Sequence, residues 1–205
     1  MRRGRRRLHC SITPLSPPHA ASYVALRRFP EALRKLDDVL NITPNDVDTI
    51  AQKADVAMAQ GDLARASSLL APLHPAADDP SPVAAQAYAA ILQRRPEPMI
   101  ARLQEILSKP DLAIGYFNGG LRFWLGWAQD VAGDHAAAQT SWRHARSELE
   151  SFLKEQPENY SLIGFLALTN TQLGDKAAAL ALSERAMCSA MILYSRLLAL
   201  PSRFN

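Results

Sequence analysis

The sequence has little that would support a disulfide framework or a membrane span. Its 205 residues include 2 cysteines, and aromatic residues make up 7%. Cys10 and Cys188 lie near opposite ends of the chain, so a zinc or redox site of the Cys-x-x-Cys kind is excluded. The longest apolar runs, such as residues 177–182, are far shorter than the roughly 20 residues that span a bilayer. We therefore expect no membrane span and a cytoplasmic location.

Motifs that carry catalysis or hold a cofactor are also missing. The sequence has no Gly-x-Gly-x-x-Gly, no Walker A loop, no Gly-x-Ser-x-Gly elbow and no His-Glu-x-x-His pair. His135 and His144 are nine residues apart, which places them on opposite faces of one helix and prevents a shared metal site. The glycine-rich stretch 115–120 follows no strand and has no lysine beside it, so we interpret it as a flexible loop. We expect a non-enzymatic protein without a metal or cofactor.

What the chain does contain favours helices. It is 48% hydrophobic and rich in alanine, a composition that suits closely packed helices better than strands. From Ser22 onward the apolar residues recur at helical spacing. The sequence therefore predicts an all-α fold.

The positive charge is concentrated at the N-terminus. Five arginines occur within the first seven residues: Arg2, Arg3, Arg5, Arg6 and Arg7. The formal charge falls from +3 to −2 once they are set aside, which argues against nucleic-acid binding by the rest of the chain. Polar residues interrupt the following stretch, so it is not a secretion signal. Its prolines disfavour a stable helix, and we expect residues 1–21 to form a disordered Arg/Pro-rich tail.

Four segments repeat one pattern of a turn residue, a polar residue, a bulky residue and a small residue three positions later. They begin at Arg27, Gly61, Gly133 and Gly174. The first two are 34 residues apart, a period that is typical of helix–turn–helix solenoids. The repeat is therefore the main guide to the architecture.

This pattern resembles the tetratricopeptide repeat, here of the bacterial helical-repeat type. In that family a glycine closes the turn between two helices, and a small residue lets them approach. Gly61, Gly133 and Gly174 match the turn, and Ala66 and Ala138 match the small position. The resemblance implies an α-α superhelix, a solenoid of about five helix–turn–helix units.

Two of the five units are irregular. In the first, Arg27 stands where glycine is usual, and the proline-rich tail shortens the preceding helix. The third would place its turn at residues 95–97, between helices over residues 82–94 and 98–108. We expect these two units to depart most from the family pattern.

The later units are longer than the standard repeat. Gly133 and Gly174 are 41 residues apart, seven more than the regular period, so the helix after Gly133 should run about two turns longer, over residues 135–155. Residues 109–120 then form the longest internal loop. We place the repeat domain at residues 22–187 and a capping helix or irregular tail at residues 188–205.

The resemblance also implies a concave groove, lined by the first helix of each unit, in which family members bind peptide segments. Its positions in this sequence are Asp48, Gln52, Asp55, Gln86, Gln93, Phe123, Trp124, Trp127, Asp130 and Phe165. Aspartates beside aromatic residues would suit a partner segment that carries apolar anchors and Lys or Arg. For Trp124 and Trp127, packing between the fourth and fifth units is the alternative to ligand contact.

The sequence thus predicts a non-enzymatic scaffold that binds an apolar and basic peptide or partner helix in the groove. The alternative is a truncated fragment, or the sensory or effector half of a larger bacterial regulator, which self-associates through an uncapped end. A homodimer would fit that alternative. The identity of the partner does not follow from the sequence.

Overall fold

The computed structural model describes residues 18–198, which form ten α-helices and one short 3-10 helix. They are α1 (Pro18–Ala25), α2 (Phe29–Ile42), α3 (Val47–Ala59), α4 (Leu63–Leu70), α5 (Pro80–Leu92), α6 (Glu97–Ser108), η1 (Leu112–Ile114), α7 (Phe117–Val131), α8 (His135–Glu155), α9 (Tyr160–Gln172) and α10 (Lys176–Leu198). Strands are absent from this part of the chain. The helices pair into five helix–turn–helix units, so the all-α solenoid predicted from the sequence is confirmed.

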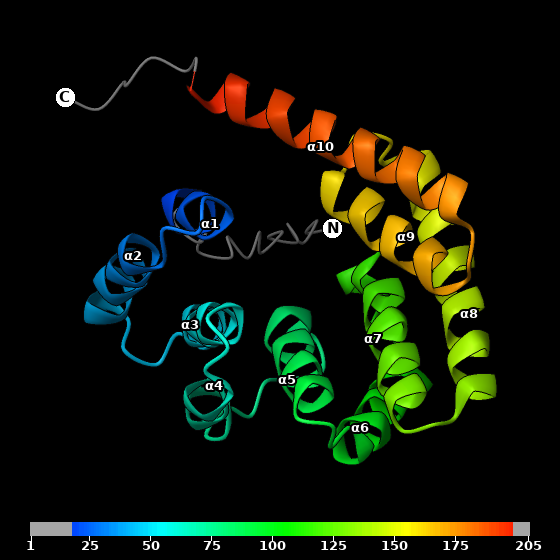
Figure 1. Ribbon diagram of the computed structural model, residues 1–205, viewed down its shortest axis with the longest axis horizontal. Helices are drawn as coiled ribbons and strands as arrows, with labels where there is room; N and C mark the ends of the chain where they lie inside the picture. The colour runs from blue at the N-terminus through cyan, green and yellow to red at the C-terminus, as the bar shows by residue number, and fades with distance from the viewer. Residues whose placement is uncertain (1–17, 199–205) are drawn as a thin grey trace, which may run out of the picture.

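The helix pairs form two curved layers. Figure 1 shows an open C in which α1, α3, α5, α7 and α9 line the inside, while the even-numbered helices cover the outside. Along the inner layer α3 contacts α5, α5 contacts α7 and α7 contacts α9. The inward faces of these helices therefore share one concave surface.

Every inner helix ends in the same turn. One residue in each turn has a positive φ: Arg27, Gly61, Arg94, Gly133 and Gly174. In the second unit the N–H of Asp62, just after the turn glycine, donates to the carbonyl oxygen of Ala57 at 2.9 Å, and the other four turns have the equivalent bond. This is the Schellman pattern that closes a helix. The third turn residue is Arg94, one residue before the turn predicted from the sequence.

The outer helices begin at side-chain caps where the turn glycine is followed by aspartate. The carboxylates of Asp62, Asp134 and Asp175 each accept a hydrogen bond from the backbone N–H three residues later, at 2.9 to 3.1 Å. An aspartate in this position satisfies one of the free N–H groups of the first helical turn. In the irregular first and third units the N-cap residues are Arg28 and Pro96, and neither makes a side-chain cap.

Small side chains separate the two layers. The position five residues after the turn is fully buried as alanine at Ala32, Ala66 and Ala138, and nearly so at Ala179. In the third unit Met99 fills it. The small position predicted from the sequence is therefore where the outer helix packs on the inner one.

The fourth unit contains one correct and one wrong prediction. Helix α8 covers His135–Glu155, as the long spacing between glycines predicted. The flexible loop predicted around residues 115–120 is wrong, because α7 begins at Phe117 and contains Gly119 and Gly120 as buried residues. A Cβ on Gly119 would lie 2.8 Å from Leu149 of α8, so glycine is needed there for close helix contact.

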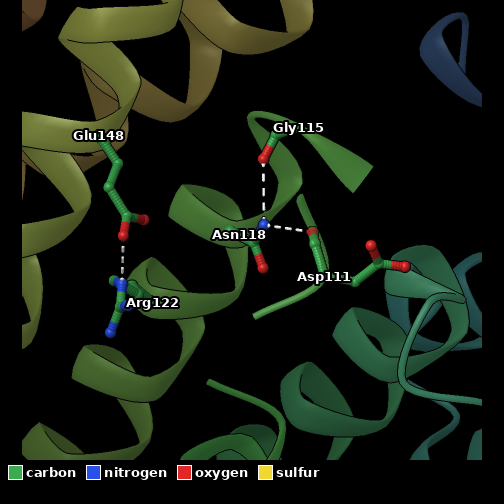
Figure 2. Close-up of polar contacts among 5 residues, drawn as sticks. All are labelled: Asp111, Gly115, Asn118, Arg122 and Glu148. Carbon is green, nitrogen blue, oxygen red and sulfur yellow. Dashed lines mark hydrogen bonds and ion pairs between the residues drawn. The ribbon is translucent and has the colours of Figure 1, made fainter. Parts of the chain in front are cut away.

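A side chain from α7 also fastens the segment that precedes it. Figure 2 shows that the Asn118 side-chain amide donates to the carbonyl oxygens of Asp111, at 2.8 Å, and Gly115, at 3.4 Å. The connecting chain is thereby held against the start of the helix at two carbonyl groups. The connection is shorter than residues 109–120 and contains η1.

The predicted domain limits stay a prediction. Helix α10 runs without interruption through the proposed boundary between residues 187 and 188. Helix α1 begins at Pro18, inside the predicted tail of residues 1–21. The rest of that tail, with its five arginines, lies outside the described residues, as do residues 199–205.

Candidate functional site

The turns give a common register for the inner helices. Counting back from each positive-φ residue, the positions thirteen, nine and six residues earlier are equivalent in every unit. From α3 to α9 these positions are Asp48, Gln52 and Asp55, then Ser81, Ala85 and Tyr88, then Gly120, Trp124 and Trp127, then Ser161, Phe165 and Leu168. Spacings of three and four residues place each triplet on one face of its helix.

A pocket of about 400 Å³ lies where these faces meet. Its lining comes from the inner helices α3, α5, α7 and α9 and from Tyr116, which directly precedes α7. The helical residues are Asp55 of α3, Pro80, Ser81, Ala84, Ala85 and Tyr88 of α5, Phe117, Gly120, Leu121 and Trp124 of α7, and Ser161 and Phe165 of α9. Four inner helices contribute to it. Its volume is within the range of small ligand sites or of one or two side chains of a bound peptide.

Aromatic rings form much of the wall. The ring centroids of Tyr88 and Trp124 are 5.5 Å apart, and Trp127 stacks behind Trp124 at 5.5 Å with an angle of 9° between the planes. Trp124 lines the pocket, whereas Trp127 backs it without being part of the lining. Phe123 is fully buried in the core against α8. The position of Trp124 therefore fits ligand contact, whereas that of Trp127 fits packing.

Asp55 is the only carboxylate in the pocket lining. Its side chain is open to solvent by surface area, and it has no hydrogen bond or ion pair with any described residue. The surrounding walls of the groove nevertheless desolvate it, and this burial raises the pKa of Asp55 to about 7. Because water still reaches the carboxylate, the energetic effect is smaller than in a sealed site.

The positive side chains of α3 and α7 are held by the outer layer. Lys53 of α3 pairs with Asp37 of α2 at 2.6 Å. Arg122 of α7 pairs with Glu148 of α8 at 2.8 Å, as Figure 2 shows. Helices α5 and α9 contain no charged residue. No lysine or arginine of the described chain lines the pocket beside Asp55.

The other predicted acidic positions lie outside the pocket. Asp48 is half-buried on α3, and its pKa is raised first by burial and then by the nearby carboxylates of Asp46 and Asp79. Asp130, near the end of α7, is 2.7 Å from Nδ1 of His135. Gln52 is half-buried next to Asp48 in the register and forms an interaction of its own.

Gln86 and Gln93 of α5 do not line the pocket. The Gln86 amide donates to the carbonyl oxygen of Leu73 at 3.0 Å and accepts from Arg102 of α6 at 3.0 Å. Gln93 donates to the Ser67 hydroxyl of α4. Both side chains therefore bind the outer layer. For Gln86 the cause is the third turn, because moving its position by one residue rotates the assignments on α5 by about 100°. Gln93 is the C-cap residue of α5 and occupies none of the three groove positions of the register.

Several pocket residues were not among the sequence candidates: Ser81, Tyr88, Tyr116, Phe117, Gly120 and Ser161. Counting back from Arg94 instead of Arg95 would have found Ser81 and Tyr88. Two adjacent arginines give no sign of which one adopts the positive φ. Phe117 and Gly120 were hidden because their segment was predicted to be a loop.

Metal-ligand clusters and membrane spans are also missing from residues 18–198. No group of three or more His, Cys, Asp or Glu side chains is arranged to hold a metal ion there. In the same region, no helix combines the length and the apolar character that crossing a bilayer requires. The pocket in the groove is the candidate site that remains.

Comparison with known proteins identifies the repeat. Residues 23–91 match the family model of the tetratricopeptide repeat. No curated protein matches the sequence significantly. Among solved structures, a crystal structure of MamA has a TM-score of 0.47 and 16% identity, with 86% of this chain and 96% of that chain covered. A second, MamA AMB-1, has a TM-score of 0.45 and 21% identity, with 82% and 92% covered. The family match covers residues 23–91, and the five equivalent turns continue the same helix–turn–helix pattern through the described residues, so the chain is a helical-repeat protein that resembles the tetratricopeptide type.

Proposed function

We propose that this protein binds a segment of a partner protein in the concave groove formed by α3, α5, α7 and α9. The tetratricopeptide-type fold supports a role as a protein-interaction scaffold. A solenoid presents an extended concave surface, which suits an extended peptide or a helix better than a small substrate. The role is non-enzymatic, and a cytoplasmic location stays a prediction.

The observation that carries the proposal is the pocket of about 400 Å³ in the groove. Aromatic rings from α5, α7 and α9 offer the kind of surface on which a few anchor residues supply most of the binding energy of an interface. Tyr88 and Trp124 are half-buried, so a ligand can still cover their exposed surface.

The charges of the groove favour a basic partner. Asp55 has no cation beside it, and the cations of the inner helices are paired with the outer layer. The ionised form of a partly desolvated, unpaired carboxylate is stabilised when a ligand brings a positive charge to it. The partner segment therefore carries apolar anchors and at least one Lys or Arg.

Selection from a library of random twelve-residue peptides displayed on phage tests this function with the full chain. We expect the selected peptides to combine Leu, Phe or Trp with Lys or Arg, and to lose binding to an Asp55→Lys variant. The matched control is Asp38→Lys, which reverses an exposed charge on α2, outside the groove. Peptides that bind the Asp55→Lys variant and the unchanged chain equally well would show that the groove is not the binding site.

A further inference from the structure

We propose that the pocket is a subsite for one arginine side chain, whose guanidinium pairs with Asp55 while its stem and planar face lie on Tyr88 and Trp124. This inference rests on the proposed groove-binding function and specifies which part of the partner enters the pocket. It also makes binding depend on the ionised form of Asp55.

An apolar anchor alone would fit the pocket poorly. Filling the space with Leu or Phe would remove water from Asp55 and provide no hydrogen bond in return, which is costly for a carboxylate. Neither α5 nor α9 has a charged residue that could compensate, and the other charged residues of α3 and α7 are Asp48, Lys53, Arg122 and Asp130. Lys53, Arg122 and Asp130 already have partners.

An arginine side chain can pair with the carboxylate and also pack on the aromatic rings. Its guanidinium presents a planar fork of N–H donors that matches a carboxylate, and the same plane stacks on aromatic rings. Its aliphatic stem covers apolar surface while the head remains hydrated or paired. The pocket lining offers a single carboxylate beside aromatic rings, which is the complement of one such side chain.

The register supports the same subsite. Asp55, Tyr88 and Trp127 are equivalent positions on successive inner helices, and Trp124 is one turn earlier on α7. The acid and the rings thus lie along one row of the concave surface, where a side chain entering from a bound segment contacts both. Tyr23, a titratable residue of α1 whose side chain the structure describes, packs with Ala32 and Leu36 of α2 and so does not share this row.

The test uses blocked single amino acids as probes and the full chain as receptor. Nα-acetyl-arginine amide is compared with the acetyl amides of citrulline, which has nearly the same shape without the charge, and of leucine. Binding is followed by NMR through the three tryptophan indole N–H signals, with the buried Trp142 of α8 as the internal reference. We expect the arginine probe to shift the Trp124 signal and to bind more tightly than the other two.

The pH dependence supplies the second readout. Arginine stays charged throughout, so a change in its affinity between pH 8 and pH 6 reports Asp55. With half-ionisation near pH 7, the binding-competent fraction and the affinity fall about tenfold over this range. Asp55→Asn should abolish both the preference for arginine over citrulline and the pH dependence, whereas Asp38→Asn, which neutralises an exposed carboxylate of α2 outside the groove, should retain them.

Three outcomes would overturn the inference: leucine amide binding as tightly as arginine amide, arginine binding equally at pH 6 and pH 8, or no shift with any probe. None of these decides the proposed function, which depends on the longer peptides selected from the library. Peptides that bind the groove without an arginine would leave the function standing and remove the subsite.

Discussion

Among the described glycines, Gly126 of α7 leaves the least room for a side chain, and replacing it with alanine should be destabilising. A Cβ built on Gly126 would lie 2.5 Å from Nε1 and 2.7 Å from Cδ1 of Trp142 in α8. Trp142 is 2% exposed, and its indole N–H donates to the carbonyl oxygen of Phe123 at 3.3 Å. The indole therefore has no free space into which it can move.

The expected loss is about 2 kcal/mol. Forcing one extra methyl group into a well-packed core costs roughly 1–3 kcal/mol, and weakening the hydrogen bond of Trp142 adds about 1 kcal/mol. Alanine offsets roughly 0.5–1 kcal/mol of this destabilisation, because it restricts the unfolded chain more than glycine and favours the helix. With a urea dependence of about 2 kcal/mol per molar, the unfolding midpoint should fall by about 1 M.

Gly164 provides a control of the same chemistry. It lies within α9, and a Cβ built on it would meet nothing within 4 Å. Gly164→Ala should therefore keep the helix gain without the clash and raise the free energy of unfolding by roughly 0.5–1 kcal/mol. Urea unfolding of both variants, followed by far-UV circular dichroism, measures the contrast directly.

A second substitution separates a true clash from a general effect on α7. Trp142→Phe removes the indole nitrogen that makes the shortest contact, so the double variant should be more stable than the sum of the two single changes predicts, by about 1 kcal/mol or more. If Gly126→Ala raised stability as Gly164→Ala does, or if the two changes were simply additive, the close approach of α7 and α8 would be refuted.

Three other changes test the caps, the turns and the acid of the groove. Asp55 has a folded-state pKa of about 7 against about 3.9 in the unfolded chain, so the folded state binds more protons between these two values. The folded state therefore loses stability as the pH rises through this window. Asp55→Asn should flatten that loss in urea midpoints measured from pH 4 to pH 8. Asp134→Ala removes the cap of α8 and should cost about 1 kcal/mol by the same assay. Gly61→Ala adds no contact within 4 Å but forces alanine to φ 81, and should cost about 1 kcal/mol.

The repeats that carry Gly-Asp were predictable from the sequence because two local requirements coincide there. The glycine permits the positive φ that closes one helix, and the aspartate caps the next, so a single dipeptide marks both boundaries. The same logic predicted the length of α8, since the distance between two such dipeptides determines how much helix must fit between them.

The third unit was predicted less well because its turn has neither residue. Arg94 adopts the positive φ at a cost that the surrounding packing offsets, and no local preference distinguishes it from Arg95. An error of one residue at that turn is small for the helix boundaries but decisive for the site, because it assigns Gln86 to the groove in place of Ala85 and misses Tyr88. Correct prediction of the pocket residues on α5 therefore required the exact position of this turn.

The glycines of α7 show a different limit. Glycine inside a segment usually indicates a turn, and the stretch before Leu121 has three of them within six residues. In the fold, Gly119 and Gly120 lie within α7. Glycine is favoured at both positions because Leu149 of α8 and Phe165 of α9 occupy the space that a Cβ atom would need. The reason for glycine is a contact with residues far along the chain, which a local pattern cannot contain.

The register also gives the groove a direction. The positions thirteen, nine and six residues before the turn are Asp48, Gln52 and Asp55 in α3 but Ser161, Phe165 and Leu168 in α9. The concave surface therefore changes from acidic to apolar along the inner layer, and Leu168 remains 50% exposed at its apolar end. A segment with separated basic and apolar residues would gain from both ends in one orientation only, since the reverse orientation would desolvate the carboxylates against apolar side chains. The order of the helices would therefore determine the orientation of the proposed partner segment, with the pocket at Asp55 between the acidic and the apolar ends.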